Sequence, residues 1–310
     1  MTVGEIVTVL IFVGIIIAVY AGEAYLIVGF VRCKRRGALT KRFRSEGAIY
    51  VHLLAAVGAG CILYGYLIEP YRIEVREVEV PTRKLHQSAI LLVQISDLHC
   101  GRRPGNEKKL VELVNDMQPD VVVFTGDSVN TLKALPLFKE TLRSIDAPLG
   151  KFAVRGNFDV WKWKNIDFFG GTGFRELDGN SIEIQKDGEM FYISGLSCEH
   201  PEKLGNLRGT IPENRFSIFL YHYPALVEDL QHLNVDLYLC GHTHGGQIAL
   251  PFYGALITMS KFGKKYESGM YTVGNTILYV NRGVGMDGGV APRVRFLARP
   301  EITVFDIKPK

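Results

Sequence analysis

The sequence predicts an α/β domain that follows two membrane-spanning helices. Two long apolar runs stand near the amino terminus, and beyond them short β-like runs alternate with helix-like segments. Polar motifs follow several of the β-like runs directly, as ligand sites do in open α/β sheets. With 310 residues, 47% hydrophobic and 22% charged, the chain is suited to one large domain with an attachment and is not intrinsically disordered.

The two apolar runs predict a membrane anchor. Residues 6–31 contain one charged residue, Glu23, and residues 47–68 contain none. Each run exceeds the roughly 20 residues that cross a hydrocarbon layer, and we expect Glu23 near the end of its span. A cleaved signal peptide is disfavoured because the amino terminus lacks a basic segment. We therefore divide the chain into an anchor (1–70), a linker (71–87) and a main domain (88–310).

A basic loop separates the two apolar runs. Its seven basic residues are Arg32, Lys34, Arg35, Arg36, Lys41, Arg42 and Arg44. The positive-inside rule places this loop in the cytoplasm of a bacterial-type cell membrane, and therefore the domain outside. A hairpin that dips into one leaflet would leave the side open. The rest of the chain holds 29 basic and 32 acidic residues, a balance that argues against nucleic-acid binding.

The expected elements of the domain follow in order from periodicity and turn residues. An alternating stretch at 73–80 predicts a linking strand. Further strands are expected at 89–95, 120–125, 151–154, 215–221, 235–240, 276–280 and 301–307, and as a hairpin within 174–196 that turns at 186–189. Helices are expected at 107–117, 136–144 and 225–233. The five cysteines form no CxxC pair, which disfavours a disulfide scaffold or a zinc knuckle.

Candidate metal ligands cluster where the expected strands end. They are Asp97, His99, Asp127, Asn157, His222, His242 and His244. Residues two apart in extended backbone point to one face, so Asp97 can converge with His99, and His242 with His244. Carboxylate, imidazole and amide ligands suit Mn²⁺, Fe²⁺ or Zn²⁺. Seven candidates exceed the needs of one tetrahedral ion and predict two ions that share a bridging carboxylate.

In the order and content of these motifs, the chain from about residue 91 onward resembles the calcineurin-like metallophosphoesterase superfamily. The motifs are Asp97-Leu98-His99, Gly126-Asp127, Gly156-Asn157-Phe158-Asp159, His222 and Gly241-His242-Thr243-His244. The later motifs Gly245-Gly246-Gln247, Asn281-Arg282-Gly283 and Arg299-Pro300-Glu301-Ile302 are similar to the membrane-attached bacterial branch. The resemblance implies a four-layer α/β/β/α sandwich with a dimetal centre, expected to hold Mn²⁺, with iron or zinc as alternatives.

The resemblance also implies a role for each matched residue. Asp97, His99, Asp127 and His244 would hold one metal, and Asp127 would bridge to a second metal held by Asn157, His222 and His242. The ions would lower the pKa of a water and neutralise phosphoryl oxygens, so Asp127 and Asn157 are expected to be catalytic. Asp159 would orient a neighbouring residue. Arg155, Arg282 and Arg293 are candidates for phosphate contacts through their planar donor groups.

One position departs from the superfamily pattern. Members usually carry a histidine, regarded as the proton donor to the leaving group, where this chain has Phe158. Either another group supplies that proton, or the leaving group departs as an anion. A nucleoside monophosphate meets the second condition, and one group of the UDP-2,3-diacylglucosamine pyrophosphatases in this superfamily also lacks the histidine. The specific prediction is hydrolysis of such a substrate to UMP and a lipid sugar phosphate, as in lipid A assembly.

The predicted topology is in conflict with that substrate, because UDP-linked substrates are cytoplasmic. An outward domain would favour a phospholipid or another extracytoplasmic phosphodiester. A catalytically inactive metal-binding protein, a protein Ser/Thr phosphatase and a nuclease are weaker alternatives. The expected partners are the lipid bilayer and a lipid-linked substrate, without nucleic acid or an obligate protein partner.

Overall fold

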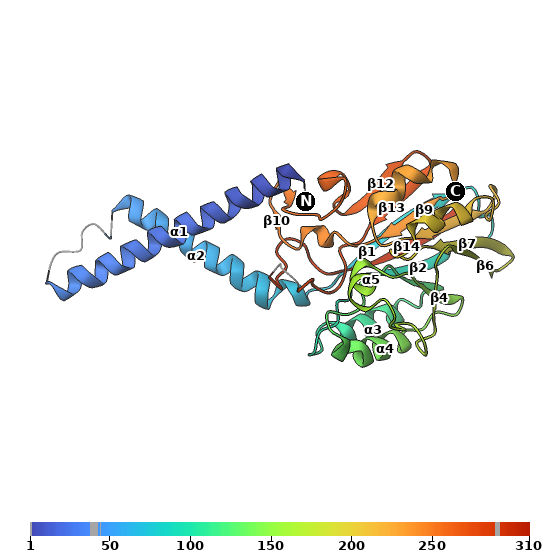
Figure 1. The fold of residues 1–310 in the computed structure, drawn as a ribbon, viewed down its shortest axis with the longest axis horizontal. Coiled ribbons are helices and arrows are strands. Elements are labelled where there is room, and N and C mark those ends of the chain that lie inside the picture. The colour runs from blue at the N-terminus through green and yellow to red at the C-terminus, as the bar shows by residue number, and fades with distance from the viewer. Residues whose placement is uncertain (1, 38–42, 44, 289–291) are drawn as a thin grey trace.

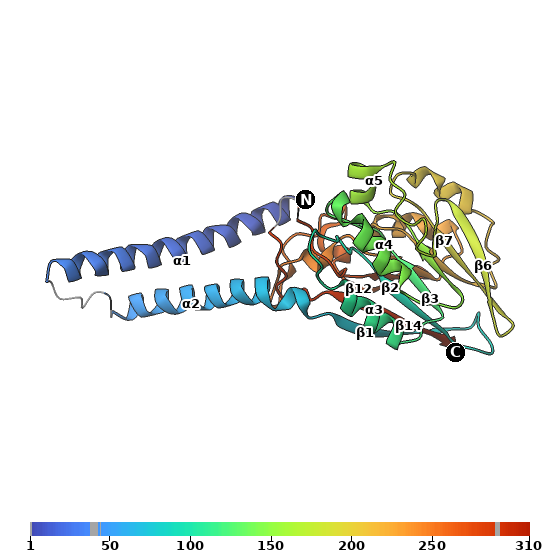
Figure 2. The same ribbon diagram turned by 90° about the horizontal axis from the view of Figure 1, so that it is seen from below.

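Two long helices project from one end of an α/β domain in the computed structural model, which describes residues 2–37, 43, 45–288 and 292–310 (Figure 1). Helices α1 (Val3–Arg35) and α2 (Glu46–Leu67) run antiparallel, side by side (Figure 2). Both are long and apolar enough to cross a membrane, and only 6% and 11% of their most apolar windows are buried. A core helix of a soluble domain would be mostly buried, so this exposure favours two membrane spans.

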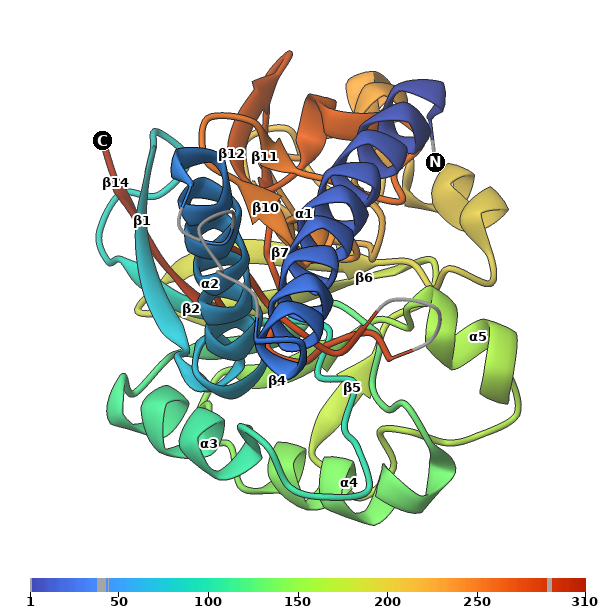
Figure 3. The same ribbon diagram turned by 90° about the vertical axis from the view of Figure 1, so that its left-hand side faces the viewer.

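Polar contacts fix the hairpin at two levels. Nδ1 of His52 lies 2.7 Å from Oε2 of Glu23, which joins the two helices inside the predicted spans. Near the start of α1, the Glu5 carboxylate accepts hydrogen bonds from the backbone N–H and the hydroxyl of Thr258, at 2.8 and 2.7 Å. The amino terminus therefore lies beside the domain, as seen from the anchor end in Figure 3.

The far end of the hairpin carries the described part of the basic loop. Arg32, Lys34 and Arg35 lie in the last turn of α1, at the end farthest from the domain (Figure 1). Lys41, Arg42 and Arg44, which belong to the same predicted loop, lie outside the described residues.

The first sheet begins directly after the anchor. A 3₁₀ turn, η2 (Glu69–Tyr71), leads from α2 into β1 (Glu74–Thr82), the expected linking strand. The strand order is β1-β14-β2-β3-β4-β5. Its other strands are β2 (Ile90–Ile95), β3 (Val121–Phe124), β4 (Gly150–Ala153), β5 (Phe174–Glu176) and β14 (Glu301–Pro309). Neighbouring strands are parallel except that β14 runs antiparallel to β2.

The second sheet has the order β12-β13-β9-β8-β7-β6. Its strands are β6 (Asn180–Lys186), β7 (Glu189–Gly195), β8 (Phe216–Leu220), β9 (Leu237–Cys240), β12 (Gly269–Val273) and β13 (Thr276–Val280). The predicted hairpin is β6–β7, and both turn residues, Asp187 and Gly188, have positive φ, as a type I′ turn requires. A two-stranded ribbon, β10 (Ala249–Leu250) with β11 (Gly254–Ala255), stands apart.

Three hydrophobic cores define four layers. Successive residues of β2 and β3 alternate between two cores, because side chains of a strand point to opposite faces. One core packs the first sheet against α3 (Glu107–Asp116) and α4 (Leu135–Arg143), and the second fills the space between the sheets. The third packs the second sheet against the 3₁₀ segments η4 (Pro201–Leu207) and η5 (Pro224–His232). The predicted four-layer sandwich is confirmed.

Candidate metal centre

The carboxyl ends of five strands converge where the two sheets face each other. Because neighbouring strands within each sheet are parallel here, their ends lie at the same edge. The predicted ligands follow them directly: Asp97 and His99 after β2, Asp127 after β3, Asn157 after β4, His222 after β8, and His242 and His244 after β9.

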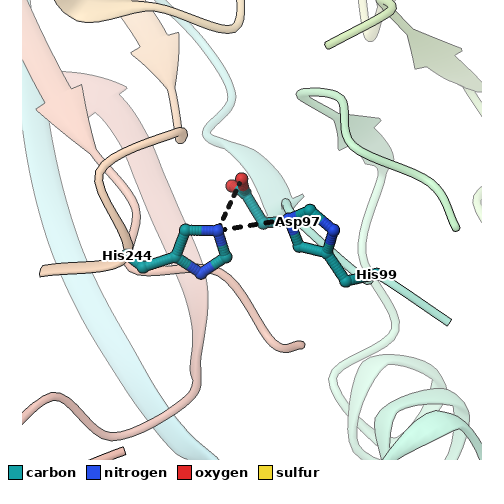
Figure 4. A group of neighbouring side chains, drawn as sticks. All are labelled: Asp97, His99 and His244. Atoms are coloured by element: carbon teal, nitrogen blue, oxygen red, sulfur yellow. Dashed lines mark hydrogen bonds and ion pairs between the residues drawn. The ribbon is translucent and has the colours of Figure 1, made fainter. Parts of the chain in front are cut away.

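These side chains form two groups that could each hold an ion. In the first, Nε2 of His244 lies 3.4 Å from Oδ1 of Asp97 and 3.2 Å from Nε2 of His99 (Figure 4). In the second, Nε2 of His222 lies 3.3 Å from Oδ2 of Asp127 and 3.9 Å from Oδ1 of Asp97. All ligand atoms of a group lie within 4.8 Å of one another, and all five residues are buried. Nε2 of His99, at 3.4 Å from Oδ2 of Asp127, connects the groups.

The backbone at this site is left-handed at five of the seven candidates. Their φ angles are 50° for Asp97, 41° for His99, 61° for Asp127, 72° for His242 and 53° for His244. A residue with a Cβ loses on the order of 1–2 kcal/mol in this conformation. Such strain persists only where the surrounding structure enforces it, and its concentration at one place indicates a functional site.

Two glycines let the loops approach the carboxylates. A Cβ on Gly156 would lie 2.1 Å from Oδ1 of Asp127, and a Cβ on Gly241 would lie 2.1 Å from Oδ2 of Asp97. No side chain fits at either position. The glycines in these two sequence motifs are therefore needed for close packing around the carboxylates.

Two buried candidate ligand atoms lack a hydrogen bond to any described residue. Nδ1 of His222 donates to the carbonyl of Thr125 at 2.7 Å, which leaves its Nε2 without a hydrogen bond and in contact with the carboxylates of Asp127 and Asp97. Oδ1 of Asn157 is likewise buried and unpaired. A buried polar atom without a hydrogen bond is costly, and both atoms are of the type that divalent metals bind. The residues therefore fit a metal centre.

Hydrogen bonds to residues outside the ligand groups orient the rings of His99 and His242. Nδ1 of His99 donates to Oδ1 of Asn130 at 3.2 Å, and Nε2 of His242 donates to the carbonyl of Met259 at 3.2 Å. These contacts leave Nε2 of His99 and Nδ1 of His242 free to face the site. The ring of His242 lies 5.2 Å from that of His222, centroid to centroid.

Buried carboxylates and imidazoles shift one another's pKa values in this site. Burial and the neighbouring Asp127 raise the pKa of Asp97, whereas His222 and His99 lower the pKa of Asp127 despite its burial. Burial alone would lower the pKa of His222, but Asp127 and Asp97 raise it to about 9. The protonated ring thus neutralises part of the charge, which a divalent cation would take over on binding.

Asp159 holds the metal-site loops together. Its buried carboxylate accepts hydrogen bonds from the backbone N–H groups of Asp127 at 3.0 Å, Ser128 at 2.9 Å and Gly156 at 2.9 Å. It also caps α5 (Asn157–Trp163), a short helix that starts at a candidate ligand. Burial and Asp127 raise the pKa of Asp159 to about 6, so the carboxylate is mostly ionised at pH 7. It touches backbone rather than candidate ligand side chains, as expected of an orienting group.

The three predicted phosphate-binding arginines lie in different surroundings. Arg155 pairs with Glu176 at 2.6 Å, and Arg282 pairs with Glu301 at 2.5 Å. Arg293 is exposed, and its guanidinium stands over Gly101, where a Cβ would lie 3.2 Å from Nη1. Ion pairs occupy the guanidinium groups of Arg155 and Arg282, whereas Arg293 has no ion pair with any described residue. Of the three, Arg293 is therefore the one available to bind phosphate.

The sequence analysis missed Arg295, a fully buried cation behind the site. Its Nη2 lies 3.3 Å from Nδ1 of His244 and donates to the carbonyls of Arg282 and Gly283, at 2.9 and 3.0 Å. Burial lowers its pKa to about 9, so it remains charged at neutral pH. A single arginine in an irregular segment carries no sequence signal that could have identified it.

Comparisons with known proteins agree with this geometry. Residues 90–246 match the calcineurin-like phosphoesterase family. The uncharacterized metallophosphoesterase YkuE of Bacillus subtilis is 36% identical over 284 residues, which cover 84% of this chain and 94% of the relative. The UDP-2,3-diacylglucosamine pyrophosphatase LpxG of Chlamydia trachomatis is 27% identical over 300 residues, with coverages of 77% and 90%. A transmembrane protein with a metallophosphoesterase domain from Danio rerio is 27% identical, with coverages of 94% and 72%.

The family match and the relatives confirm the predicted enzyme class, a metal-dependent phosphoesterase. Calcineurin-like phosphoesterases use a dimetal site, and this chain holds two candidate ligand groups at the matching strand ends. The chain belongs to the calcineurin-like phosphoesterase family and is a phosphoester hydrolase with two candidate membrane-spanning helices.

Proposed function

We propose that this enzyme hydrolyses a pyrophosphate or phosphodiester bond in a lipid-linked substrate, with UDP-2,3-diacylglucosamine as the specific candidate. The observation that carries the proposal is the position of Phe158. Its backbone N–H donates to Oδ1 of Asp127 at 2.9 Å, and its ring packs edge-to-face with that of His99, with centroids 4.8 Å apart. An apolar ring thus lies beside the candidate ligand His99, where it cannot give a proton to a leaving group.

A leaving group that departs as an anion suits this environment. The Nζ of Lys162, one turn later on α5, lies 3.9 Å from the centroid of the Phe158 ring. Its positive charge would stabilise a departing phosphate such as UMP. An alkoxide leaving group would instead need the missing proton donor.

We propose the following roles for the candidate ligands. Asp97, His99, Asp127 and His244 would hold one divalent ion, and Asn157, His222 and His242 would hold the second, with Asp127 shared. The ions, for which we propose Mn²⁺, would supply a water of lowered pKa and neutralise phosphoryl oxygens. By accepting backbone N–H groups from both, Asp159 would fix the loop of Asp127 against the loop that carries Asn157.

Two further observations support a lipid-linked substrate. The two LpxG proteins of Chlamydia match 82% and 77% of this chain, and these matches extend beyond the segment that matches the family. The domain follows the second apolar helix with only η2 between them, so the site stays close to any membrane that the helices cross.

The direct test is UMP release from UDP-2,3-diacylglucosamine by detergent-purified, Mn²⁺-loaded protein. We expect turnover that Asp127→Asn abolishes. Hydrolysis of bis(4-nitrophenyl) phosphate without UMP release would retain the hydrolase and reject this substrate. Metal binding without turnover of either compound would favour the catalytically inactive alternative.

A second candidate, an extracytoplasmic phosphodiesterase, is favoured by the basic residues at the far end of α1. The positive-inside rule would place that end in the cytoplasm and the domain outside. Protease treatment of intact spheroplasts distinguishes the two candidates. Digestion of the domain favours an extracytoplasmic phosphodiester, and protection favours the UDP-linked substrate.

A further inference from the structure

A cleft of about 590 Å³ connects the end of α2 with the metal centre. One wall is apolar and is formed by Tyr66, Leu67 and Tyr71. The facing wall is the loop after β2, which carries Arg102 and Arg103, and Arg293 adds a third cation. We call this feature the arginine cleft. Its lining includes the candidate metal ligand His99, and its volume is typical of a small-molecule site.

The cations of the arginine cleft are available to a ligand. Arg102, Arg103 and Arg293 are exposed, and none of them forms an ion pair with a described residue. Among the described residues of the lining, Glu107 is the only acidic one, and its buried carboxylate accepts the N–H of Gly105. The cleft therefore presents net positive charge, and planar guanidinium groups match phosphate oxygens in pairs.

The apolar wall continues the surface of the membrane anchor. Tyr66, Leu67 and Tyr71 are 59%, 58% and 53% exposed, and they follow the exposed apolar surface of α2 toward the domain. Tyrosines at the end of a membrane span lie at the level of the lipid headgroups. The cleft thus opens where the hydrocarbon layer ends.

Hydrogen bonds hold this wall against the domain. Nδ2 of Asn106 donates to the carbonyl of Pro70 at 2.7 Å, and the N–H of Arg295 donates to the carbonyl of Gly65 at 2.9 Å. The N–H of Ala298 donates to Oε1 of the buried Glu69 at 2.7 Å. The two walls are therefore fixed relative to each other, which lowers the entropic cost of binding between them.

We infer that the arginine cleft binds the phosphate headgroup and the adjoining acyl carbons of an amphiphilic substrate while the rest of its chains stay in the bilayer. The inference rests on the proposed function and makes the end of α2 part of the substrate site. Arg102, Arg103 and Arg293 contact phosphate oxygens, and Tyr66, Leu67 and Tyr71 contact the chains. The phosphoester bond then lies toward His99.

The test uses full-length protein in detergent and the short-chain lipid dihexanoyl phosphatidate, below its micelle concentration. The lipid is tested as an inhibitor of bis(4-nitrophenyl) phosphate hydrolysis, and the inhibition constant of inorganic phosphate is measured in parallel. For the double variant Arg102→Gln/Arg103→Gln we expect the inhibition constant of the lipid to rise about tenfold or more, because charge-assisted hydrogen bonds are lost. The control Arg208→Gln alters an exposed arginine after η4, outside the cleft, and leaves the constant unchanged.

The apolar wall has its own variant. Leu67→Gln should weaken inhibition by dihexanoyl phosphatidate and leave inorganic phosphate unaffected. Titration calorimetry with the Asp127→Asn protein gives the same comparisons without turnover. Equal binding to the cleft variants and to Arg208→Gln would overturn the inference. So would a parallel loss of inorganic phosphate binding in Leu67→Gln, because the substitution would then disturb the phosphate site rather than a contact with the lipid chains.

The experiments distinguish failure of the proposed function from failure of the arginine cleft as a lipid site. Lipid binding that depends on the arginines, without UMP release from UDP-2,3-diacylglucosamine, retains the cleft and rejects that substrate. UMP release that is unchanged in the double variant retains the pyrophosphatase and rejects the cleft.

Discussion

Phe158 sets which leaving groups the site can release. Phe158→His would place a proton donor beside His99, where the apolar ring now lies. General acids typically contribute 10²–10⁴-fold when the leaving group is basic. We therefore expect hydrolysis of an alkyl phosphodiester to rise at least about tenfold, and that of bis(4-nitrophenyl) phosphate to change less than about threefold. The pH–rate profile of the variant on the alkyl ester should gain a limb on which activity falls as the new acid deprotonates.

Phe158→Gln is the matched control, because it is polar but cannot act as an acid. A gain shared by the glutamine variant would assign the effect to polarity rather than proton transfer. An equal gain on both substrates would contradict the role that we assign to Phe158.

At the residue scale, the sequence predicted which candidate ligands lie together better than it predicted which arginines are available to a substrate. A candidate ligand follows a strand end at a fixed spacing, so its place is encoded locally, as for Asp97 and His99. An arginine reaches its partner through tertiary structure. Arg155 and Arg282 carry the same donors as Arg293, yet Glu176 of β5 and Glu301 of β14 pair with the first two. No local pattern distinguishes these three residues.

Asp178 links the turn before β6 to the 3₁₀ segment η4, which packs on the second sheet. Its carboxylate accepts hydrogen bonds from Nδ1 of His200 at 2.8 Å, from the N–H of Ser197 at 3.2 Å and from Nζ of Lys203. Burial would raise the pKa of Asp178, but these donors lower it below its usual 3.8. Its contribution to stability is therefore present above about pH 4 and lost as the pH falls through the folded-state pKa.

Asp178→Asn tests this link. We expect the free energy of unfolding in urea to fall by about 1–3 kcal/mol at pH 7. The difference from the unaltered protein should be smaller at pH 3 than at pH 7, because a growing fraction of the Asp178 carboxylate is protonated as the pH falls toward its folded-state pKa. Asp116→Asn, at an exposed position at the end of α3, is the control. An equal loss at both pH values would show that packing, rather than charge, accounts for the effect.

At the element scale, the sequence predicted most strands and missed segments without a regular pattern. The buried strands β2, β3, β8 and β9 have clear apolar runs between turns. The helix α5 was missed because it has only seven residues and starts inside a metal motif. The segment expected as a helix at 225–233 is the 3₁₀ segment η5, which begins at Pro224.

The whole domain should depend on bound metal for its stability. Five candidate ligands have strained backbone, and Asp97 and Asp127 bring buried carboxylates together. A ligand at about 1,000 times its dissociation constant adds about 4 kcal/mol. Chelation should therefore lower the unfolding temperature of the detergent-solubilised protein by on the order of 10 °C relative to Mn²⁺-loaded protein.

Asp127→Asn provides the control for chelation, because it should show a much smaller shift. Equal unfolding temperatures with and without Mn²⁺ would mean that the fold enforces the site without the ions. Thermal scanning measures this without any assay of activity.

The pairing of β1 with β14 has a consequence for the timing of synthesis. In the first sheet β14 lies between β1 and β2, although the ribosome makes it after every other strand of both sheets. Until Glu301–Pro309 has emerged, β1 and β2 each keep an unpaired edge, and exposed strand edges invite aggregation. The two apolar helices are made first, and if they insert into a membrane, the nascent domain would wait at its surface until the sheet can close.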